Sequence, residues 1–225
     1  MEKKGSGLFQ DRPLLVAPAG KHFPDFPRAG NWLSGFLFLQ EGAKPGGDLS
    51  KMNKPKNQII LREATSQDLP LLRHWDSQPH VMASDPNDDW QWEVELARNP
   101  AWREQLIAEL NVRPIGFIQI IDPAREETHY WGEVPANLRA IDIWIGEKED
   151  LGKGYGTGMM QLALERCFQD EKVTAVLIDP LETNREAHRF YERLGFRFVE
   201  KRKFGDDDCF VYLLDRDNWQ KRKGK

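Results

Sequence analysis

A glycine-rich turn between an apolar strand pattern and an amphipathic helix pattern constrains the fold of this chain more than any other feature. The strand pattern covers residues 140–145, and the turn, Leu-Gly-Lys-Gly-Tyr-Gly-Thr, covers 151–157. The helix pattern continues from Gly158 to about Gln169. Closely spaced glycines allow a tight turn whose backbone N–H groups point outward, at the positive end of the helix dipole. Such a turn suits a pyrophosphate; a simple tight turn is the alternative, because the segment is neither G-x-G-x-x-G nor a P-loop.

Composition narrows the class of protein. The chain has 225 residues, 40% of them hydrophobic, which is enough for one buried domain and an extension. Its apolar runs, such as 36–39, are far shorter than the roughly 20 residues of a membrane span, and no signal-peptide pattern is present at the N-terminus. The two cysteines, Cys167 and Cys209, form neither a disulfide framework nor a metal-ligand spacing. We therefore expect a cytoplasmic protein without a metal site or a membrane contact.

Charge and glycine content divide the chain into two parts. Residues 1–56 have a net charge of +4 and contain 14 of the 32 glycines and prolines, so we expect a poorly ordered N-terminal extension. The other residues have a net charge of −8, which argues against nucleic acid as a partner and suits a small cationic ligand. We assign the folded domain to 57–220 and a solvated basic tail to 221–225.

Strand and helix patterns follow one another throughout the domain. We expect strands over 59–62, 105–110, 115–121, 140–145, 173–178, 198–200 and 209–214, and helices over 69–75, 90–99, 158–169 and 184–194. A loop of about sixteen residues spans 122–138. Because this loop is too long to be only a connection, we expect it to contact a substrate.

The order of elements around the glycine turn resembles that of the GNAT acetyltransferase superfamily. It runs strand, glycine turn, helix, strand, an Asn-containing loop and a helix that ends at Leu194-Gly195-Phe196. Within the superfamily the chain is most similar to aminoglycoside 6'-N-acetyltransferases, over roughly residues 58–219. The similar segments are 139–142, 151–157, 178–180 and 184–191. The resemblance implies an α/β (α+β) fold, with a mixed, twisted sheet of six to seven strands, helices on both faces and a split beside the turn.

The same resemblance implies acetyl-CoA as the cosubstrate. In the family the glycine turn holds the pyrophosphate, and the Asn and Tyr lie along the pantetheine and the thioester. Carried onto this sequence, the cofactor-binding residues are Ile143, Trp144, Ile145, Gly152, Lys153, Gly154, Tyr155, Gly156, Thr157, Asn184 and Ala187. Judged from its position at a helix start, Asn184 can instead be an N-cap.

Two aspartates lie in, or directly after, neighbouring strand patterns. Because Ile141, Ile143 and Ile145 share one face of their strand, Asp142 lies on the other face. It either lies on a solvated sheet face or accepts a proton from an amine, since a half-buried carboxylate without a partner is costly. Asp179 ends the next strand, at a position that commonly lines a ligand crevice or else simply begins a turn. If both carboxylates face one pocket, they can hold two ammonium groups of one polyamine-like ligand.

The candidate site also includes Tyr191 and, for the acceptor, two tryptophans and a glutamate. Tyr191 is the candidate acid or hydrogen-bond donor for the departing thiolate, because a phenol of pKa ~10 transfers its proton to a thiolate of pKa ~8.5 slightly uphill; its alternative is a core aromatic. Flat aromatics beside carboxylates suit an aminosugar, so we assign Trp92, Trp131 and Glu133 to the acceptor together with Asp179. Core tryptophans and solvated charges are the alternative.

The sequence therefore predicts an acetyl-CoA-dependent N-acetyltransferase that acts on a primary amine of a cationic small molecule. The catalytic residues are Asp142 and Tyr191. The resemblance points to the 6'-amine of an aminoglycoside as the acceptor. A siderophore-type hydroxylamine acyltransferase, a protein N-terminal acetyltransferase and a non-catalytic acyl-CoA-sensing module remain alternatives, and the protein is expected to be a monomer or a homodimer.

Overall fold

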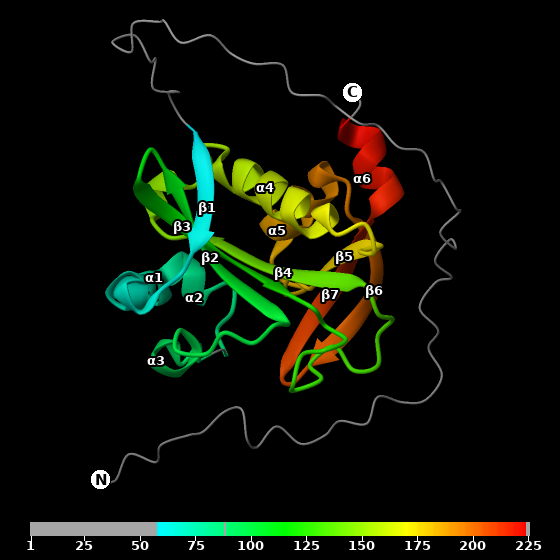
Figure 1. Cartoon of the computed structure of the whole chain (residues 1–225), viewed down its shortest axis with the longest axis horizontal. Helices are drawn as coiled ribbons and strands as arrows, with labels where there is room; N and C mark the ends of the chain where they lie inside the picture. Colours follow the sequence, from blue (N-terminus) through cyan, green and yellow to red (C-terminus); the bar gives the residue numbers. More distant parts are fainter. Residues whose placement is uncertain (1–57, 88, 224–225) are drawn as a thin grey trace, which may run out of the picture.

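A mixed seven-stranded sheet forms the centre of the protein, in a computed structural model that describes residues 58–87 and 89–223 (Figure 1). The strands are β1 (Ile59–Glu63), β2 (Arg103–Leu110), β3 (Arg113–Ile121), β4 (Leu138–Ile145), β5 (Ala175–Ile178), β6 (Arg197–Phe204) and β7 (Asp207–Asp215). Their spatial order is β1-β2-β3-β4-β5-β7-β6, and within this sheet β4 and β5 pair in parallel while the other neighbours pair antiparallel. The predicted fold class is confirmed; the expected extension over 1–56 lies outside the described residues.

Helices cover both faces of the sheet. They are α1 (Leu69–Asp76), α2 (Pro79–Met82), α3 (Trp92–Glu95), α4 (Tyr155–Gln169), α5 (Arg185–Leu194) and α6 (Arg216–Lys223), with short 3-10 helices at Ser66–Asp68 and Lys148–Asp150. Figure 1 shows α4, α5 and α6 on one side of the sheet and α1, α2 and α3 on the other. The first group packs on the largest apolar cluster, and the second contributes to a smaller cluster around Trp75, Trp92 and Phe117.

Alternation along β4 decides which side chains meet each helix layer. Ile141, Ile143 and Ile145 pack into the cluster beneath α4, whereas Trp144 packs with the smaller cluster on the opposite face. A strand places successive side chains on opposite faces, so Asp142 shares the face of Trp144. This arrangement is the one predicted from the sequence.

The sheet splits between β4 and β5. The register pairs Leu138 with Ala175 and ends at Ala140 with Leu177, although β4 continues to Ile145. Beyond Ala140, β4 remains paired with β3 on its other side. Among the residues that the structure describes, the edge of β4 that faces β5 therefore has no strand partner along its last residues, which is the split that the resemblance implied.

Two segments differ from the sequence expectation because tertiary contacts override the local pattern. The helix expected over 90–99 is only the four-residue α3, because Gln91 before it adopts a left-handed conformation (φ 44°) and the backbone N–H groups of Ala97 and Arg98 after it form short i→i+3 turn bonds. Helix α6 was not expected, and it includes Lys221–Lys223 of the predicted basic tail. Its first residue, Arg216, donates hydrogen bonds to the carbonyl oxygens of three residues around the end of α4, namely Phe168, Asp170 and Val173.

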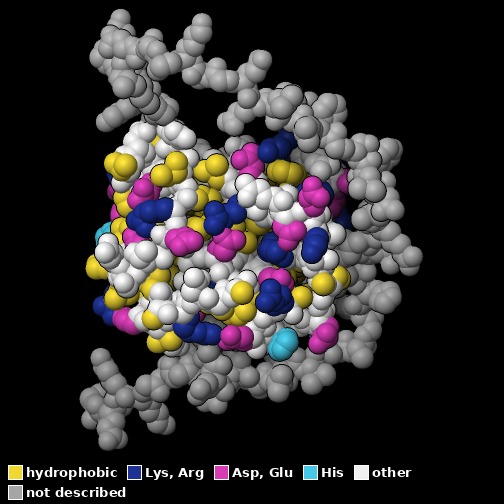
Figure 2. Space-filling view, viewed as in Figure 1, with side chains coloured by type: hydrophobic (Ala, Val, Ile, Leu, Met, Phe, Trp, Pro, Cys, Tyr) yellow, Lys and Arg dark blue, Asp and Glu magenta, His cyan; other side chains and the backbone are white. Residues whose placement is uncertain are grey.

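The described surface carries charges of both signs. Figure 2 shows Lys and Arg side chains interspersed with Asp and Glu side chains over the face in view. Among the described residues, none of the helices is both long enough and apolar enough to cross a membrane.

Candidate active site

Two carboxylates flank the split between β4 and β5. The last paired residues are Ala140 and Leu177. Asp142 follows two positions later within β4, and Asp179 follows two positions later in the chain, one residue past the end of β5. Because side chains alternate along a strand, a step of two keeps each aspartate on the face of the paired residue before it. Both aspartates therefore lie on the same face of the sheet, one on each side of the opening, and the negative charges of both act on Tyr130 and Tyr191.

Asp179 is held by a tyrosine of the long loop between β3 and β4. The hydroxyl of Tyr130 donates a hydrogen bond to Asp179 Oδ2 over 2.7 Å. Burial raises the pKa of Asp179 to about 6, although the Tyr130 hydrogen bond and the positive charge of Arg202 act in the opposite direction. Burial and the charge of Asp179 raise the pKa of Tyr130 well above its usual value, so this phenol keeps its proton and donates.

The ring of Tyr130 packs against Phe204 and remains partly exposed to solvent. It stacks on Phe204 with 4.5 Å between centroids and 8° between planes, and the guanidinium of Arg202 lies 5.5 Å from the Phe204 centroid. Glu126 holds the loop, because its carboxylate accepts hydrogen bonds from the backbone N–H groups of Thr128 and Tyr130. With 38% of its surface exposed, Tyr130 offers an aromatic contact beside the two aspartates.

Tyr191 of α5 lies close enough to the two carboxylates for their charges to act on it. Its ring is 8% exposed and packs edge-on against Phe196. Burial raises the pKa of Tyr191, and the negative charges of Asp142 and Asp179 raise it further. A phenol with a raised pKa transfers a proton less readily to a thiolate, so the environment of Tyr191 suits a hydrogen-bond donor better than a full proton donor.

The glycine turn is shaped by backbone conformation. Gly152 and Gly154 have φ values of +73° and +81°, and Gly154 immediately precedes α4. These positive φ values favour glycine, because a residue with a side chain is strained there. A side-chain carbon added at either position would meet no heavy atom within 4 Å, so the space beside the turn is open. The first N–H groups of a helix have no partner within the helix and attract anions. The turn therefore fits the pyrophosphate of acetyl-CoA.

A buried carboxylate anchors this turn. Asp150 is 4% exposed and accepts from Arg113 over 2.6 Å and from Lys153 over 3.1 Å. The hydrogen bond from Arg113 is the main cause that lowers the pKa of Asp150 below its usual value. Lys153, predicted as a pyrophosphate ligand, thus has its ammonium group on Asp150. Sequence analysis did not identify Asp150, although it lies directly before the glycine turn.

The other predicted cofactor residues lie on β4, in the first turn of α4 and at the start of α5. Trp144 stacks on Phe117 at 4.6 Å, while the backbone of Ile143, Trp144 and Ile145 forms the part of β4 beyond its pairing with β5. Asn184 is the N-cap of α5, and its Oδ1 accepts the backbone N–H of Ala187 over 3.0 Å. Tyr155, Gly156 and Thr157 form the first turn of α4. The capping bond uses the side-chain carbonyl of Asn184, and the amide NH₂ group is not part of it.

Two predicted acceptor residues belong to the core instead. Trp92 is 3% exposed, stacks on Trp90 at 5.0 Å and donates its indole N–H to Asp76, and Trp131 is 4% exposed in a separate apolar cluster. Buried rings offer no face to a ligand, so we correct these two assignments. Glu133 is exposed. Tyr130, next to Trp131 in the same loop, is the more exposed aromatic residue of the two.

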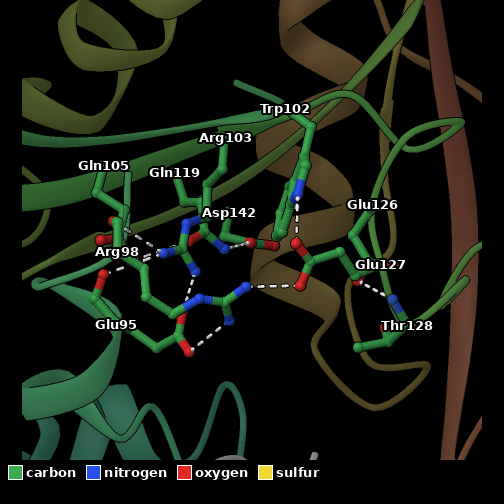
Figure 3. A network of polar contacts seen from close by, with 10 residues as sticks. All are labelled: Glu95, Arg98, Trp102, Arg103, Gln105, Gln119, Glu126, Glu127, Thr128 and Asp142. Atoms are coloured by element: carbon green, nitrogen blue, oxygen red, sulfur yellow. Dashed lines mark hydrogen bonds and ion pairs between the residues drawn. The ribbon is translucent and has the colours of Figure 1, made fainter. Parts of the chain in front are cut away.

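Asp142 belongs to a polar network on the sheet face (Figure 3). It accepts a hydrogen bond from Gln119, which accepts one from Gln105, and the ion pair of Glu95 with Arg103 lies nearby in the same view. Sequence analysis named none of these partners, because a glutamine inside an apolar strand pattern gives only a weak indication of function.

Comparison with known proteins agrees with this geometry. The family model described as an acetyltransferase (GNAT) domain matches residues 64–204. The aminoglycoside N(6')-acetyltransferase type 1 of Klebsiella pneumoniae is 30% identical over 163 residues, covering 65% of this chain and 78% of that protein. The kanamycin resistance protein of Rhizobium radiobacter is 36% identical over 72 residues, covering 32% of this chain and 67% of that protein.

Solved structures give the same result. The crystal structure of aminoglycoside acetyltransferase AAC(6')-Ib in complex with coenzyme A has a TM-score of 0.67 and 26% sequence identity, covering 74% of this chain and 99% of that chain. The complex of AAC(6')-Ib with coenzyme A and kanamycin has a TM-score of 0.66 at the same identity and coverage. The chain therefore belongs to the GNAT acetyltransferase family, and it is an acetyl-CoA-dependent N-acetyltransferase whose relatives include aminoglycoside 6'-N-acetyltransferases.

Proposed function

We propose that this enzyme acetylates a primary amine of a small polycationic molecule, with the 6'-amine of an aminoglycoside as the acceptor. The observation that carries the proposal is the pair formed by Asp142 and Asp179, on one sheet face and on opposite sides of the split. Two carboxylates so placed match a ligand with more than one ammonium group. The relatives named as aminoglycoside N(6')-acetyltransferases support the same acceptor.

In this proposal Asp142 binds the reacting amine and takes its proton. The acceptor arrives as an ammonium ion, which has no lone pair, so it must lose a proton before it attacks the thioester. A carboxylate of ordinary pKa ~3.9 is a weak base for an amine near ~10.4. Asp142 therefore acts chiefly by binding the cation and passing its proton toward solvent.

Transfer then forms the bond from the amine nitrogen to the acetyl carbon and breaks the bond from that carbon to sulfur. The leaving group is the CoA thiolate, and Tyr191 donates a hydrogen bond to it. The phenol is suited to this because its raised pKa keeps the proton on oxygen. The turn around Gly152 and Gly154 holds the pyrophosphate during the reaction.

Asp179 and Tyr130 bind the part of the acceptor that does not react. With a pKa of about 6, Asp179 is mostly ionised at neutral pH, so it can pair with a second ammonium group. Tyr130 offers its exposed ring to an apolar sugar face while its hydroxyl holds Asp179. Glu133 is exposed in the same loop and adds negative charge to the acceptor side.

A thiol-release assay with acetyl-CoA tests the acceptor. The acceptors are matched aminoglycosides that differ only in carrying an amine or a hydroxyl at the 6' position, together with a linear polyamine, a hydroxylamine and a short peptide. We expect turnover of the 6'-amine compounds, at least 100-fold slower turnover of the 6'-hydroxyl compounds, and a product acetylated at the 6' nitrogen by NMR. Faster turnover of the hydroxylamine or the peptide would show that the acceptor class is wrong, while acetyl transfer itself would remain.

A further inference from the structure

A row of polar side chains crosses three strands on the face that carries Asp142. In the sheet register, Gln105 of β2 pairs with Gln119 of β3, and Gln119 pairs with Asp142 of β4. Residues directly opposite on neighbouring antiparallel strands have side chains about 5 Å apart. The nearest positions on the same face of β3 are Phe117 and Ile121, so the row crosses apolar surroundings.

Each hydrogen bond along this row is donated by a glutamine NH₂ group toward the next residue on the way to Asp142. Gln105 Nε2 donates to Gln119 Oε1 over 3.2 Å, and Gln119 Nε2 donates to Asp142 Oδ2 over 3.0 Å. Gln119 is only 7% exposed. Turning its amide around would place an oxygen against the carboxylate and lose both bonds, which is costly for a buried polar group. The carboxylate of Asp142, which can only accept, therefore fixes which end of the Gln119 amide faces it, and the NH₂ group of Gln105 holds the Gln119 oxygen on the other side.

We propose that Gln119 is a positioning residue that holds the Asp142 carboxylate in its ionised form and in one orientation, with Gln105 holding Gln119 in turn. An N–H donor favours the charged form of the carboxylate to which it donates. The inference rests on the role proposed above for Asp142. It goes further, because it assigns the orientation of that carboxylate to two side chains that do not touch the acceptor.

Charged and titratable groups surround Asp142 on several elements. Tyr130 of the long loop and Tyr191 of α5 both interact with its charge, and Asp179 lies across the split. Beyond Gln105 on β2, the buried guanidinium of Arg103 pairs with Glu95 of α3 (Figure 3). The row therefore ends at a buried ion pair in which each charge has a partner, and Gln119 is the neutral donor between that pair and Asp142.

Steady-state kinetics of the full chain with acetyl-CoA and the best amine from the acceptor panel test the proposal. We expect Gln119→Leu to lower kcat/KM for the amine by about tenfold, with the KM for acetyl-CoA unchanged, and Gln105→Leu to lower it by about threefold. Gln161→Leu, on the exposed surface of α4, is the matched control and leaves both constants unchanged. In the Asp142→Asn background, Gln119→Leu should cause no further loss, because the ionised carboxylate that Gln119 supports has been removed.

A second variant keeps the test decisive if Gln119→Leu folds poorly. Gln119→Glu places a second carboxyl beside Asp142, and two like charges at this distance share a proton. We expect the acid limb of the pH profile of kcat/KM to move to higher pH by about one unit. A purely structural role would lower the amount of active enzyme and leave the position of this limb unchanged.

The outcomes separate this inference from the proposed function. If Gln119→Leu has no effect, or loses activity by the same factor in the Asp142→Asn background, Gln119 is not a positioning residue although Asp142 keeps its role. An unmoved acid limb in Gln119→Glu overturns the inference in the same way. If Asp142→Asn itself retains full activity, the role of Asp142 is wrong, and the inference falls with it.

Discussion

The proposed cofactor half and the proposed acceptor half of this enzyme are built by different kinds of interaction. The cofactor half runs from β4 through the glycine turn into α4, so a short stretch of chain contains most of its determinants. The acceptor half combines β2, β3, the long loop and the ends of β4 and β5 through side-chain contacts such as that of Tyr130 with Asp179. Backbone conformation therefore dominates one half and long-range side-chain pairing dominates the other.

This difference predicts that substitutions in the two halves will separate cleanly in kinetics. Changes among the acceptor carboxylates should affect the amine and spare acetyl-CoA. Changes in the glycine turn should weaken acetyl-CoA binding and leave the KM for the amine nearly unchanged. The four substitutions below test this separation, beginning with the largest expected effect.

Asp142→Asn should reduce kcat by about 100-fold or more, because a positioned acid or base typically contributes at least this factor. The KM or Kd for acetyl-CoA should stay within about twofold of wild type, since the turn is unchanged. Steady-state kinetics and calorimetric titration of acetyl-CoA check the two parts. Undiminished turnover would remove Asp142 from the reaction.

Asp179→Asn should raise the KM for a polycationic acceptor by about tenfold, because one charge-assisted contact is lost. It should also change how stability depends on pH. The native pKa of about 6 exceeds the value of ~3.9 for an unfolded aspartate, so the native state holds this proton more tightly. The wild type therefore loses stability as the pH rises from about 4 to about 6, and the asparagine variant does not.

Denaturant titrations from pH 4 to pH 7 measure this second effect. The stability of Asp179→Asn relative to wild type should increase over that range, by at most about 3 kcal/mol. A constant difference would mean that Asp179 is ionised as easily in the folded protein as in the unfolded chain.

Gly154→Ala tests the cofactor half. Its φ of +81° is costly for a residue with a side chain, by roughly 1–2 kcal/mol. We expect weaker acetyl-CoA binding, by about tenfold, with little change in the KM for the amine. Gly154→Asn is the matched comparison, because asparagine tolerates left-handed conformations better, and it should recover part of the lost stability in thermal unfolding. Equal stability of the alanine variant and wild type would contradict the conformational argument.

Tyr130→Phe should have the smallest effect, a few-fold increase in the acceptor KM at pH 7. The ring keeps its stacking on Phe204, and only the hydrogen bond to Asp179 is lost. Because that bond lowers the pKa of Asp179, its removal should move the acid limb of the acceptor pH profile upward. A profile identical to that of wild type would show that Tyr130 does not set the ionisation of Asp179.

The accuracy of the sequence predictions differs between the two halves in the same way. The turn, α4 and the alternation of β4 were all predicted, because each depends on residues adjacent in the chain. Trp92 and Trp131 were placed wrongly, because the type of side chain does not say whether a tryptophan is buried. Helix α6 was missed, since it depends on the contacts of Arg216 with residues near the end of α4 and on the stacking of Trp219 against Phe168.

The amino-acid sequence by itself determined the family, the glycine turn and the two aspartates in and after neighbouring strands, because these are encoded in local spacing and in positions of positive φ that only glycine occupies without strain. The tertiary structure decided which groups surround those aspartates. It brought Tyr130 onto Asp179 across 49 positions of the chain, and Gln119 onto Asp142 across 23. Contacts of this kind form only when the sheet register and the loop conformation are fixed together, so no local pattern of residues contains them.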